Sequence, residues 1–145
     1  MKPRLSTQDS KEIDYLKKYV NLQNLRITNC ELVEFNISVE NPDVKIAPML
    51  LIPFVENAYK HTTDKEKQHG IVINLREKSG IINFSVSNLH DPNKIISKDS
   101  SKGIGINNVS KRLQILYPDK HKLEISHDEK LFKISLEIDA TWQMR

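Results

Sequence analysis

Residues 46–61, IAPMLLIPFVENAYKH, combine an apolar run with a polar pattern that packing alone would not select. At about 100° per residue, one face of a helix here carries only apolar side chains, those of Leu51, Phe54, Val55 and Ala58. The other face gathers four polar side chains around Pro53, those of Glu56, Asn57, Lys60 and His61. The first face predicts a contribution to a hydrophobic core, and the second predicts a functional surface.

An amide, an ammonium and an imidazole group are neighbours on the polar face. Asn57 lies three residues before Lys60 and four before His61, which is the spacing of adjacent side chains on a helix. An amide oxygen is a hard ligand of the kind that Mg²⁺ accepts, and a lysine can neutralise a phosphate. The set suits a metal ion with phosphate oxygens, and the alternative is the ordinary solvated side of an amphipathic helix.

Length and composition predict one domain with a true core, since 38% of the 145 residues are hydrophobic. The net charge of +3 is compatible with a small anionic ligand or with nucleic acid, so it does not decide between them. The single cysteine, Cys30, excludes an internal disulfide. No apolar run approaches the ~18 residues of a membrane span or has the layout of a signal peptide. We expect a soluble piece in a reducing compartment.

A first helix is predicted from a capping box at Ser6 and Asp9 to about Asn29. It carries one apolar stripe formed by Ile13, Leu16, Val20 and Ile27. A second stripe, of Tyr15, Tyr19 and Leu22, lies nearly opposite. Two stripes predict partners on both sides, either a helix outside this chain or a second copy, and tyrosine rings that simply lie at a surface are the alternative.

Alternating apolar residues predict strands over 33–39, 71–77, 82–88, 123–125 and 132–138, with a hairpin turn at 78–80. Asn88 continues the buried side of Phe84 and Val86 at the point where its strand ends, so an amide should face the covering layer. A turn asparagine with satisfied hydrogen bonds is the alternative. Between the first two strands, Pro48 suits the opening turn of a helix, and Pro53, inside that helix, should then bend it or remove a backbone hydrogen bond.

A polar loop over residues 90–102 is long enough to predict a lid. It leads into Gly103-Ile104-Gly105 and a helix that Tyr117-Pro118 ends. A glycine pair at the start of a helix lets backbone amides approach a phosphate, and the alternative is a flexible start to the helix. The order of elements predicts an α+β fold, a two-layer α/β sandwich with a mixed, mostly antiparallel sheet and helices on one face.

These residues resemble a known family. The run IAPMLLIPFVENAYKH, with GIGINNVSKRLQILYP about forty residues later, is similar to the N box and G2 box of LytS-like sensor histidine kinases, within the Bergerat-fold ATPases. The first helix, with YLKKYVNLQNLR, resembles the segment that leads out of the dimerisation helices. The resemblance implies a connector or the end of a dimerisation helix over 1–30, an ATP-binding catalytic domain over 31–140 and a tail over 141–145.

The resemblance implies a kinase that uses ATP and Mg²⁺ to phosphorylate a histidine on a dimerisation helix, from which the phosphoryl group passes to a response regulator. By position, Asn57 would be the Mg²⁺ ligand and would act in catalysis with Lys60, while Glu56 would be an acid–base or orienting group. The implied nucleotide-binding positions are Asn57, Lys60, His61, Asn88, Gly103, Ile104, Gly105 and Asn108.

Three positions depart from the family pattern. Asn88 stands where an aspartate usually reads the adenine amino group, and the glycines that normally follow it are absent. Thr62 replaces a common glycine. Pro53 occupies the position of the water-activating glutamate of hydrolysing relatives, which favours phosphoryl transfer over hydrolysis. The altered adenine-side motif leaves open a pseudokinase-like nucleotide-binding or interaction module.

None of the five histidines lies in a motif similar to the family's H box, so we expect a fragment that binds ATP weakly with Mg²⁺ and does not phosphorylate itself. The expected partners are the dimerisation domain of the parent kinase, a response regulator and a second copy through the first helix. Nucleic acid is not expected, because the lysines of 62–69 and 90–102 alternate with acids and have no aromatic platform. The resemblance suggests a bacterial parent in the cytoplasmic membrane, with this domain in the cytoplasm.

Overall fold

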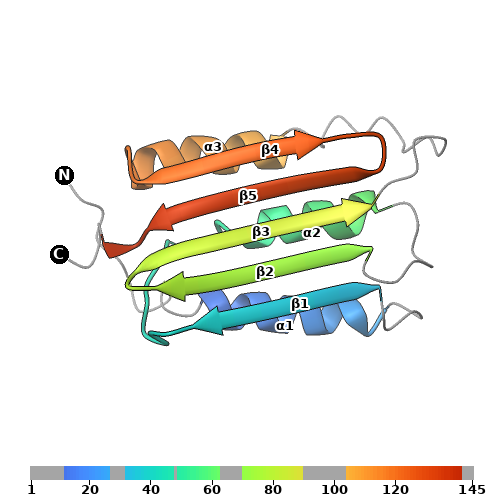
Figure 1. The fold of residues 1–145 in the computed structure, drawn as a ribbon, viewed down its shortest axis with the longest axis horizontal. Coiled ribbons are helices and arrows are strands. Elements are labelled where there is room, and N and C mark those ends of the chain that lie inside the picture. Colours follow the sequence, from blue (N-terminus) through green and yellow to red (C-terminus); the bar gives the residue numbers. More distant parts are fainter. Residues whose placement is uncertain (1–11, 27–31, 48, 63–69, 90–103, 142–145) are drawn as a thin grey trace.

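The computed structural model describes residues 12–26, 32–47, 49–62, 70–89 and 104–141 (Figure 1). The elements follow the order predicted from the sequence. They are α1 (Glu12–Asn24), β1 (Val33–Val39), α2 (Ile52–His61), β2 (Ile71–Lys78), β3 (Ile81–Leu89), α3 (Ile104–Leu116), β4 (His121–His127) and β5 (Leu131–Asp139).

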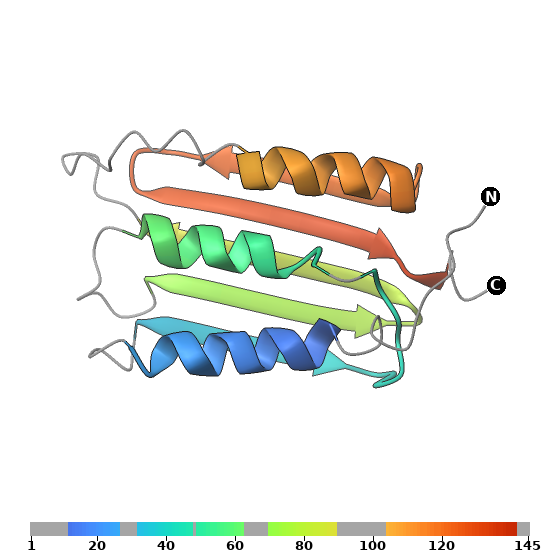
Figure 2. The same cartoon turned by 180° about the vertical axis from the view of Figure 1, so that it is seen from behind.

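The five strands form one sheet in the order β1-β2-β3-β5-β4. β1 and β2 pair in parallel, because the chain returns through α2 between them, and the other neighbours are antiparallel. All three helices cover the same face, with α2 between α1 and α3 (Figure 2). The predicted α+β sandwich with a mixed sheet and a single helical layer is therefore confirmed.

The β2–β3 hairpin is closed by a two-residue turn, since Lys78 pairs with Ile81. Ser79 and Gly80 both have positive φ, 53° and 82°, as a type I′ turn requires. The buried carboxylate of Glu77 accepts a hydrogen bond from Gly80 N at 3.0 Å and another from Asn41 N at 2.7 Å. One side chain thus fixes both the hairpin turn and the chain that leaves β1.

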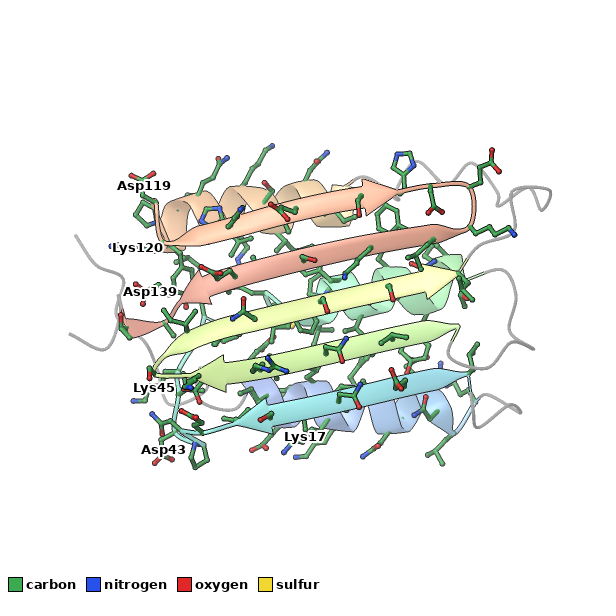
Figure 3. All side chains as sticks on the ribbon, viewed as in Figure 1. Lys17, Asp43, Lys45, Asp119, Lys120 and Asp139 are labelled. Atoms are coloured by element: carbon green, nitrogen blue, oxygen red, sulfur yellow. The ribbon has the colours of Figure 1, made fainter. Side chains whose placement is uncertain are left out.

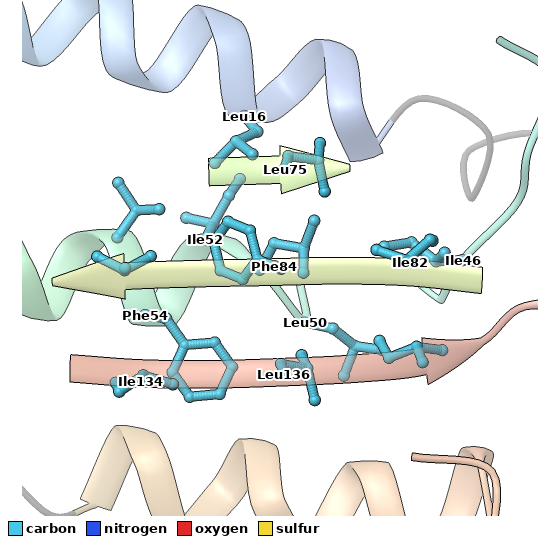
Figure 4. Close-up of a cluster of buried hydrophobic side chains, with 14 of the residues drawn as sticks. Leu16, Ile46, Leu50, Ile52, Phe54, Leu75, Ile82, Phe84, Ile134 and Leu136 are labelled. Atoms are coloured by element: carbon cyan, nitrogen blue, oxygen red, sulfur yellow. The ribbon is translucent and has the colours of Figure 1, made fainter. Parts of the chain in front are cut away.

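The core lies between the sheet and the helices (Figure 4). Its largest members come from every layer and are almost fully buried, among them Leu16, Phe54, Leu75, Phe84 and Leu136. Burial of each such side chain contributes about 1.5–3 kcal/mol to the free energy of unfolding. The apolar face predicted for residues 51–58 is confirmed, because all four of its side chains are at most 1% exposed.

α1 differs from its prediction at its end and on its second stripe. It ends at Asn24, with a turn at residues 25 and 26, and residues 1–11 and 27–31 lie outside the described part. Leu16 and Val20 are buried as expected, but Tyr19 also packs against the core. Tyr15 and Leu22 are 58% and 54% exposed. One stripe is therefore packed within this chain, and two members of the other face solvent.

α2 begins later than predicted. Its first residue is Ile52, so Pro53 lies in the first turn, where a missing backbone N–H breaks no helical hydrogen bond. The expectation that Pro53 bends the helix from inside was wrong for this reason. Met49 has φ 62°, a left-handed conformation that a continuous helix over these residues would not allow. Pro48 lies outside the described residues.

The face of the sheet opposite the helices is open and polar (Figure 3). One row of paired residues crosses all five strands there, formed by Asn36, Asn74, Ser85, Ser135 and Glu124. Within it, Asn36 Nδ2 donates to Asn74 Oδ1 at 2.9 Å. A depression of about 670 Å³ lies over this face and is lined by none of the site residues predicted from the sequence.

Candidate active site

α2 turns different sides toward its two neighbouring helices. Tyr59 Oη donates to Asn24 Oδ1 of α1 at 3.0 Å, and the Tyr59 ring packs edge-on against Tyr19 with centroids 6.3 Å apart. Tyr59 therefore marks the side that faces α1. At 3.6 residues per turn, Asn57 lies about 160° around the helix from Tyr59. Because α2 lies between α1 and α3, Asn57 is on the side that faces α3 (Figure 2).

Three residues of the predicted polar face differ in their exposure to solvent. Asn57 is half-buried and Lys60 is exposed, as a surface facing a ligand would require. His61 is only 4% exposed, so its assignment to the polar face opposite the core was wrong. His61 comes seven residues after Phe54, two full turns of the helix, and therefore follows the stripe that enters the core. This spacing was visible in the sequence.

Glu56 is exposed and lies toward α1. Burial raises the pKa of Tyr19, and the negative charge of Glu56 raises it further. Glu56 is thus close enough to act on a tyrosine of α1, and it is about 100° around α2 from Asn57. The two adjacent residues of the N-box-like motif face in different directions.

The end of α2 is joined to the end of β3. Thr62 is 5% exposed, and its Oγ1 donates to Leu89 O at 3.1 Å. Asn88, the residue before Leu89, is 2% exposed and shares the buried side of β3 with Phe84 and Val86. The prediction that an amide at this strand end faces the helical layer is therefore confirmed.

α3 begins at the same end of the molecule where α2 and β3 end (Figures 1 and 2). Ile104 and Gly105 form the first turn of α3, and Asn108 is exposed on its second turn. The positive end of the α3 dipole therefore points toward this end of the helical layer. Gly103, the predicted lid over 90–102 and the connection over 63–69 lie outside the described residues.

Glu12, at the start of α1, is a polar residue that the sequence analysis did not single out. It is 2% exposed, and its two carboxylate oxygens accept hydrogen bonds from Met49 N at 3.0 Å and Leu51 N at 3.4 Å. Burial raises its pKa, although backbone amides and Arg112 act in the opposite direction. The available signal was its position four residues before Leu16, on the buried stripe.

No group of three or more histidine, cysteine, aspartate or glutamate residues within the described segments could hold a metal ion. The donor set at this end of the layer is instead an amide oxygen on Asn57 with a lysine close by. Such a set fits Mg²⁺, which usually keeps several waters and takes few protein ligands.

Comparisons with known proteins give relatives by sequence and by structure, and no family model matches. Sensor protein kinase HptS of Staphylococcus aureus is 28% identical over 127 residues, covering 80% of this chain and 24% of HptS. The catalytic domain of histidine kinase ThkA superposes with a TM-score of 0.56 at 19% identity, covering 92% of this chain and 96% of that domain. Full-length ShkA in complex with AMPPNP gives 0.55 at 16% identity, covering 87% of this chain and 29% of ShkA.

The chain thus has sequence homology to a sensor kinase and the fold of histidine kinase catalytic domains. It spans about a quarter of the length of HptS. In the segments that the structure describes, no helix is both long enough and apolar enough to cross a membrane. The LytS-like subtype stays a prediction from the sequence motifs.

Proposed function

We propose that this chain is the ATP-binding catalytic domain of a sensor histidine kinase. In this proposal it transfers the γ-phosphoryl group of ATP to a histidine on a dimerisation helix, from which the group passes to a response regulator. Homology to HptS and the fold of histidine kinase catalytic domains support the assignment. The observation that carries it is the position of Asn57 on α2, about 160° around the helix from Tyr59, which contacts α1, and therefore on the side toward α3.

The proposed roles follow the chemistry of phosphoryl transfer, which asks a protein mainly for positioning and charge neutralisation. Asn57 would hold Mg²⁺ through its amide oxygen, and Lys60, on the exposed side of the same turn, would contact a phosphate. Bound Mg²⁺ would supply positive charge for the phosphate oxygens. Further phosphate contacts are proposed for His61 and for the start of α3, at Gly103, Ile104, Gly105 and Asn108.

Asn88 is the proposed contact for adenine. Its position on the buried side of β3, next to the bond between Thr62 and Leu89, supports this role. Its carbonyl oxygen can accept a hydrogen bond from the adenine amino group without bringing a charge. Glu56 is proposed as an orienting or acid–base group, reached from the α1 side of α2.

We further propose that residues 1–30 connect residues 31–140 to a dimerisation domain, with 141–145 as a tail. The exposed side chains of Tyr15, Leu22 and Leu25 on and after α1 offer an apolar stripe for a helix of that domain or of a second copy. A response regulator is the proposed downstream partner, as ThkA has been crystallised with the response regulator TrrA. The parent would be a bacterial membrane sensor with this domain in the cytoplasm.

The deciding experiment is a calorimetric titration of the chain with ATP in the presence and absence of Mg²⁺. We expect Mg²⁺-dependent binding, which Asn57→Ala should weaken about tenfold or more through loss of one metal ligand. Asn83→Ala is the matched control, because Asn83 is an exposed asparagine on the open face of the sheet. Equal affinity in Asn57→Ala and the control would favour a pseudokinase-like module in place of a kinase.

Phosphoryl transfer is tested by adding a separately prepared dimerisation segment that carries the acceptor histidine. We expect acid-labile phosphate on that segment and none on the catalytic chain alone. Phosphohistidine on the isolated chain would contradict the proposal that the acceptor histidine lies on a separate dimerisation segment.

A further inference from the structure

The segment over residues 44–51 connects β1 to α2 and is held by side chains from both outer helices. From α1, the carboxylate of Glu12 binds two of its backbone amides. From α3, Arg112 Nη1 donates to Met49 O at 3.1 Å, and Tyr117 Oη, one residue after the end of α3, accepts from Ala47 N at 2.9 Å. All three helices therefore meet at the few residues before α2 begins.

Met49 has a backbone conformation that it would not adopt unaided. Its φ of 62° is in the left-handed region, which a residue with a Cβ atom disfavours. Its N–H is taken by Glu12 and its carbonyl oxygen by Arg112. These two side chains hold the sharp change of direction that starts α2.

The start of α2 lacks a cap of its own. The residue at the N-cap is Leu51, which makes no side-chain capping bond, and leucine is among the poorest residues at this position. The Glu12 carboxyl group lies at this end of α2, where the helix dipole favours the negative charge of its ionised form. At the other end of α2, Tyr59 is bonded to Asn24 of α1. α1 is thus attached to α2 at both ends.

Burial disfavours the ionised form of the Glu12 carboxyl group. Burial is the largest influence on its pKa and raises it, even with Arg112 and the amides of residues 49–51 acting against it. The ionised form is therefore less favourable in the folded protein than in water. The hydrogen bonds that this side chain accepts come from Met49 N and Leu51 N, directly before the first residue of α2, and this geometry indicates a role in placing α2.

We infer that Glu12 is a positioning residue for the site, because it fixes the start of α2 and thereby the direction of Asn57. A shift of α1 along α2 would then change nucleotide binding without any contact between α1 and the nucleotide. The effect on nucleotide binding rests on the proposed function of Asn57, whereas the hold of Glu12 on α2 does not.

The test compares Glu12→Gln with Asp14→Asn, which removes an exposed acid from the same first turn. Amide hydrogen exchange is followed in the nucleotide-free chain, and KM for ATP and kcat are measured with a supplied phosphoacceptor segment. In Glu12→Gln we expect exchange of residues 50–58 to accelerate about tenfold, and KM for ATP to rise about tenfold with kcat changed less. Asp14→Asn should resemble the unsubstituted chain in every readout.

Two further variants test the hold on the start of α2 if Glu12→Gln does not fold. Glu12→Asp keeps the charge but is one methylene shorter, so it should give an intermediate effect. Arg112→Met removes the bond to Met49 O from the α3 side and should raise exchange over the same residues. Exchange and KM equal to those of Asp14→Asn in all folded variants would overturn the inference.

The two proposals fail in different ways. If the unsubstituted chain does not bind Mg-ATP, the proposed function fails and the effect of Glu12 on nucleotide binding fails with it. Faster exchange of residues 50–58 in Glu12→Gln would still establish the hold on α2. If the unsubstituted chain binds Mg-ATP and Glu12→Gln binds equally well, only the inference about Glu12 fails.

Discussion

Glu12 of α1 and Arg112 of α3 bind the backbone of the same residue, Met49, one at its N–H and the other at its carbonyl oxygen. Burial raises the pKa of Glu12, and the positive charge of Arg112 acts in the opposite direction with a smaller effect. Met49, three residues before the first residue of α2, therefore links the two outer helices, α1 and α3. This link gives the first of four predictions.

The stability of the protein should depend on pH through Glu12. Its pKa is raised above the usual 4.5, so its contribution to the free energy of unfolding is full below pH 4.5 and is lost as the pH rises through the raised value. The difference in that free energy, unsubstituted chain minus Glu12→Gln, should therefore fall across this window. Urea unfolding in steps from about pH 4 to about pH 7 measures it. A difference that rises with pH would refute the prediction.

Tyr59→Phe should destabilise the contact between α1 and α2 moderately. It removes the hydrogen bond to Asn24 Oδ1 but keeps the ring beside Tyr19, so we expect a loss of about 0.5–1.5 kcal/mol. Chemical denaturation gives the value. The matched control is Tyr15→Phe, at a ring that is 58% exposed, and equal losses in both variants would mean that the bond to Asn24 contributes nothing.

Pro53→Ala should change the free energy of unfolding by less than about 1 kcal/mol, because proline is well tolerated in the first turn of a helix. A proline inside the helix would instead cost about 3 kcal/mol, and its replacement would stabilise the protein by a similar amount. Thermal unfolding of the two proteins distinguishes these cases. A large gain in stability would place the start of α2 before Ile52.

Gly80→Ala should destabilise the protein by about 1–3 kcal/mol. Gly80 has φ 82°, and a Cβ atom added there would collide with Cγ2 of Thr141. Thr141→Ser removes that methyl group, so the double variant should recover the steric part of the loss and keep the part due to backbone strain. Denaturation of the two single variants and the double variant separates the parts. Full additivity of the losses would exclude the collision.

The strands and the fold could be predicted because their signals are local. Alternation in 71–77 and 82–88 identifies the faces of a hairpin, and Asn88 follows its neighbours onto the buried side at the distance of two residues. Ser79 and Gly80 form a two-residue turn, and glycine in particular accepts the positive φ that such a turn requires. Each of these predictions depends only on residues a few positions apart.

The errors arose where distant contacts override local pattern. Pro48 and Pro53 are both acceptable near a helix start, and the choice between them is made by Met49, whose conformation depends on Glu12 and Arg112. Glu12 is 37 residues away from Met49 along the chain, and Arg112 is 63 residues away. His61 is a different case, since its spacing from Phe54 already indicated the core.

β1 is an edge strand whose one neighbour in the sheet, β2, pairs with it in parallel, and α1 lies beside β1 on the helical face (Figure 1). The hairpins β2–β3 and β4–β5 each pair strands that are adjacent in the chain, whereas β1 can pair with β2 only after the chain has returned through α2. We therefore expect α1 and β1 to form late during folding and to detach as one cooperative unit in partial unfolding, ahead of the hairpins. Among the helices and strands that the structure describes, α1 and β1 would then be the least protected against hydrogen exchange and the first to be opened to a protease.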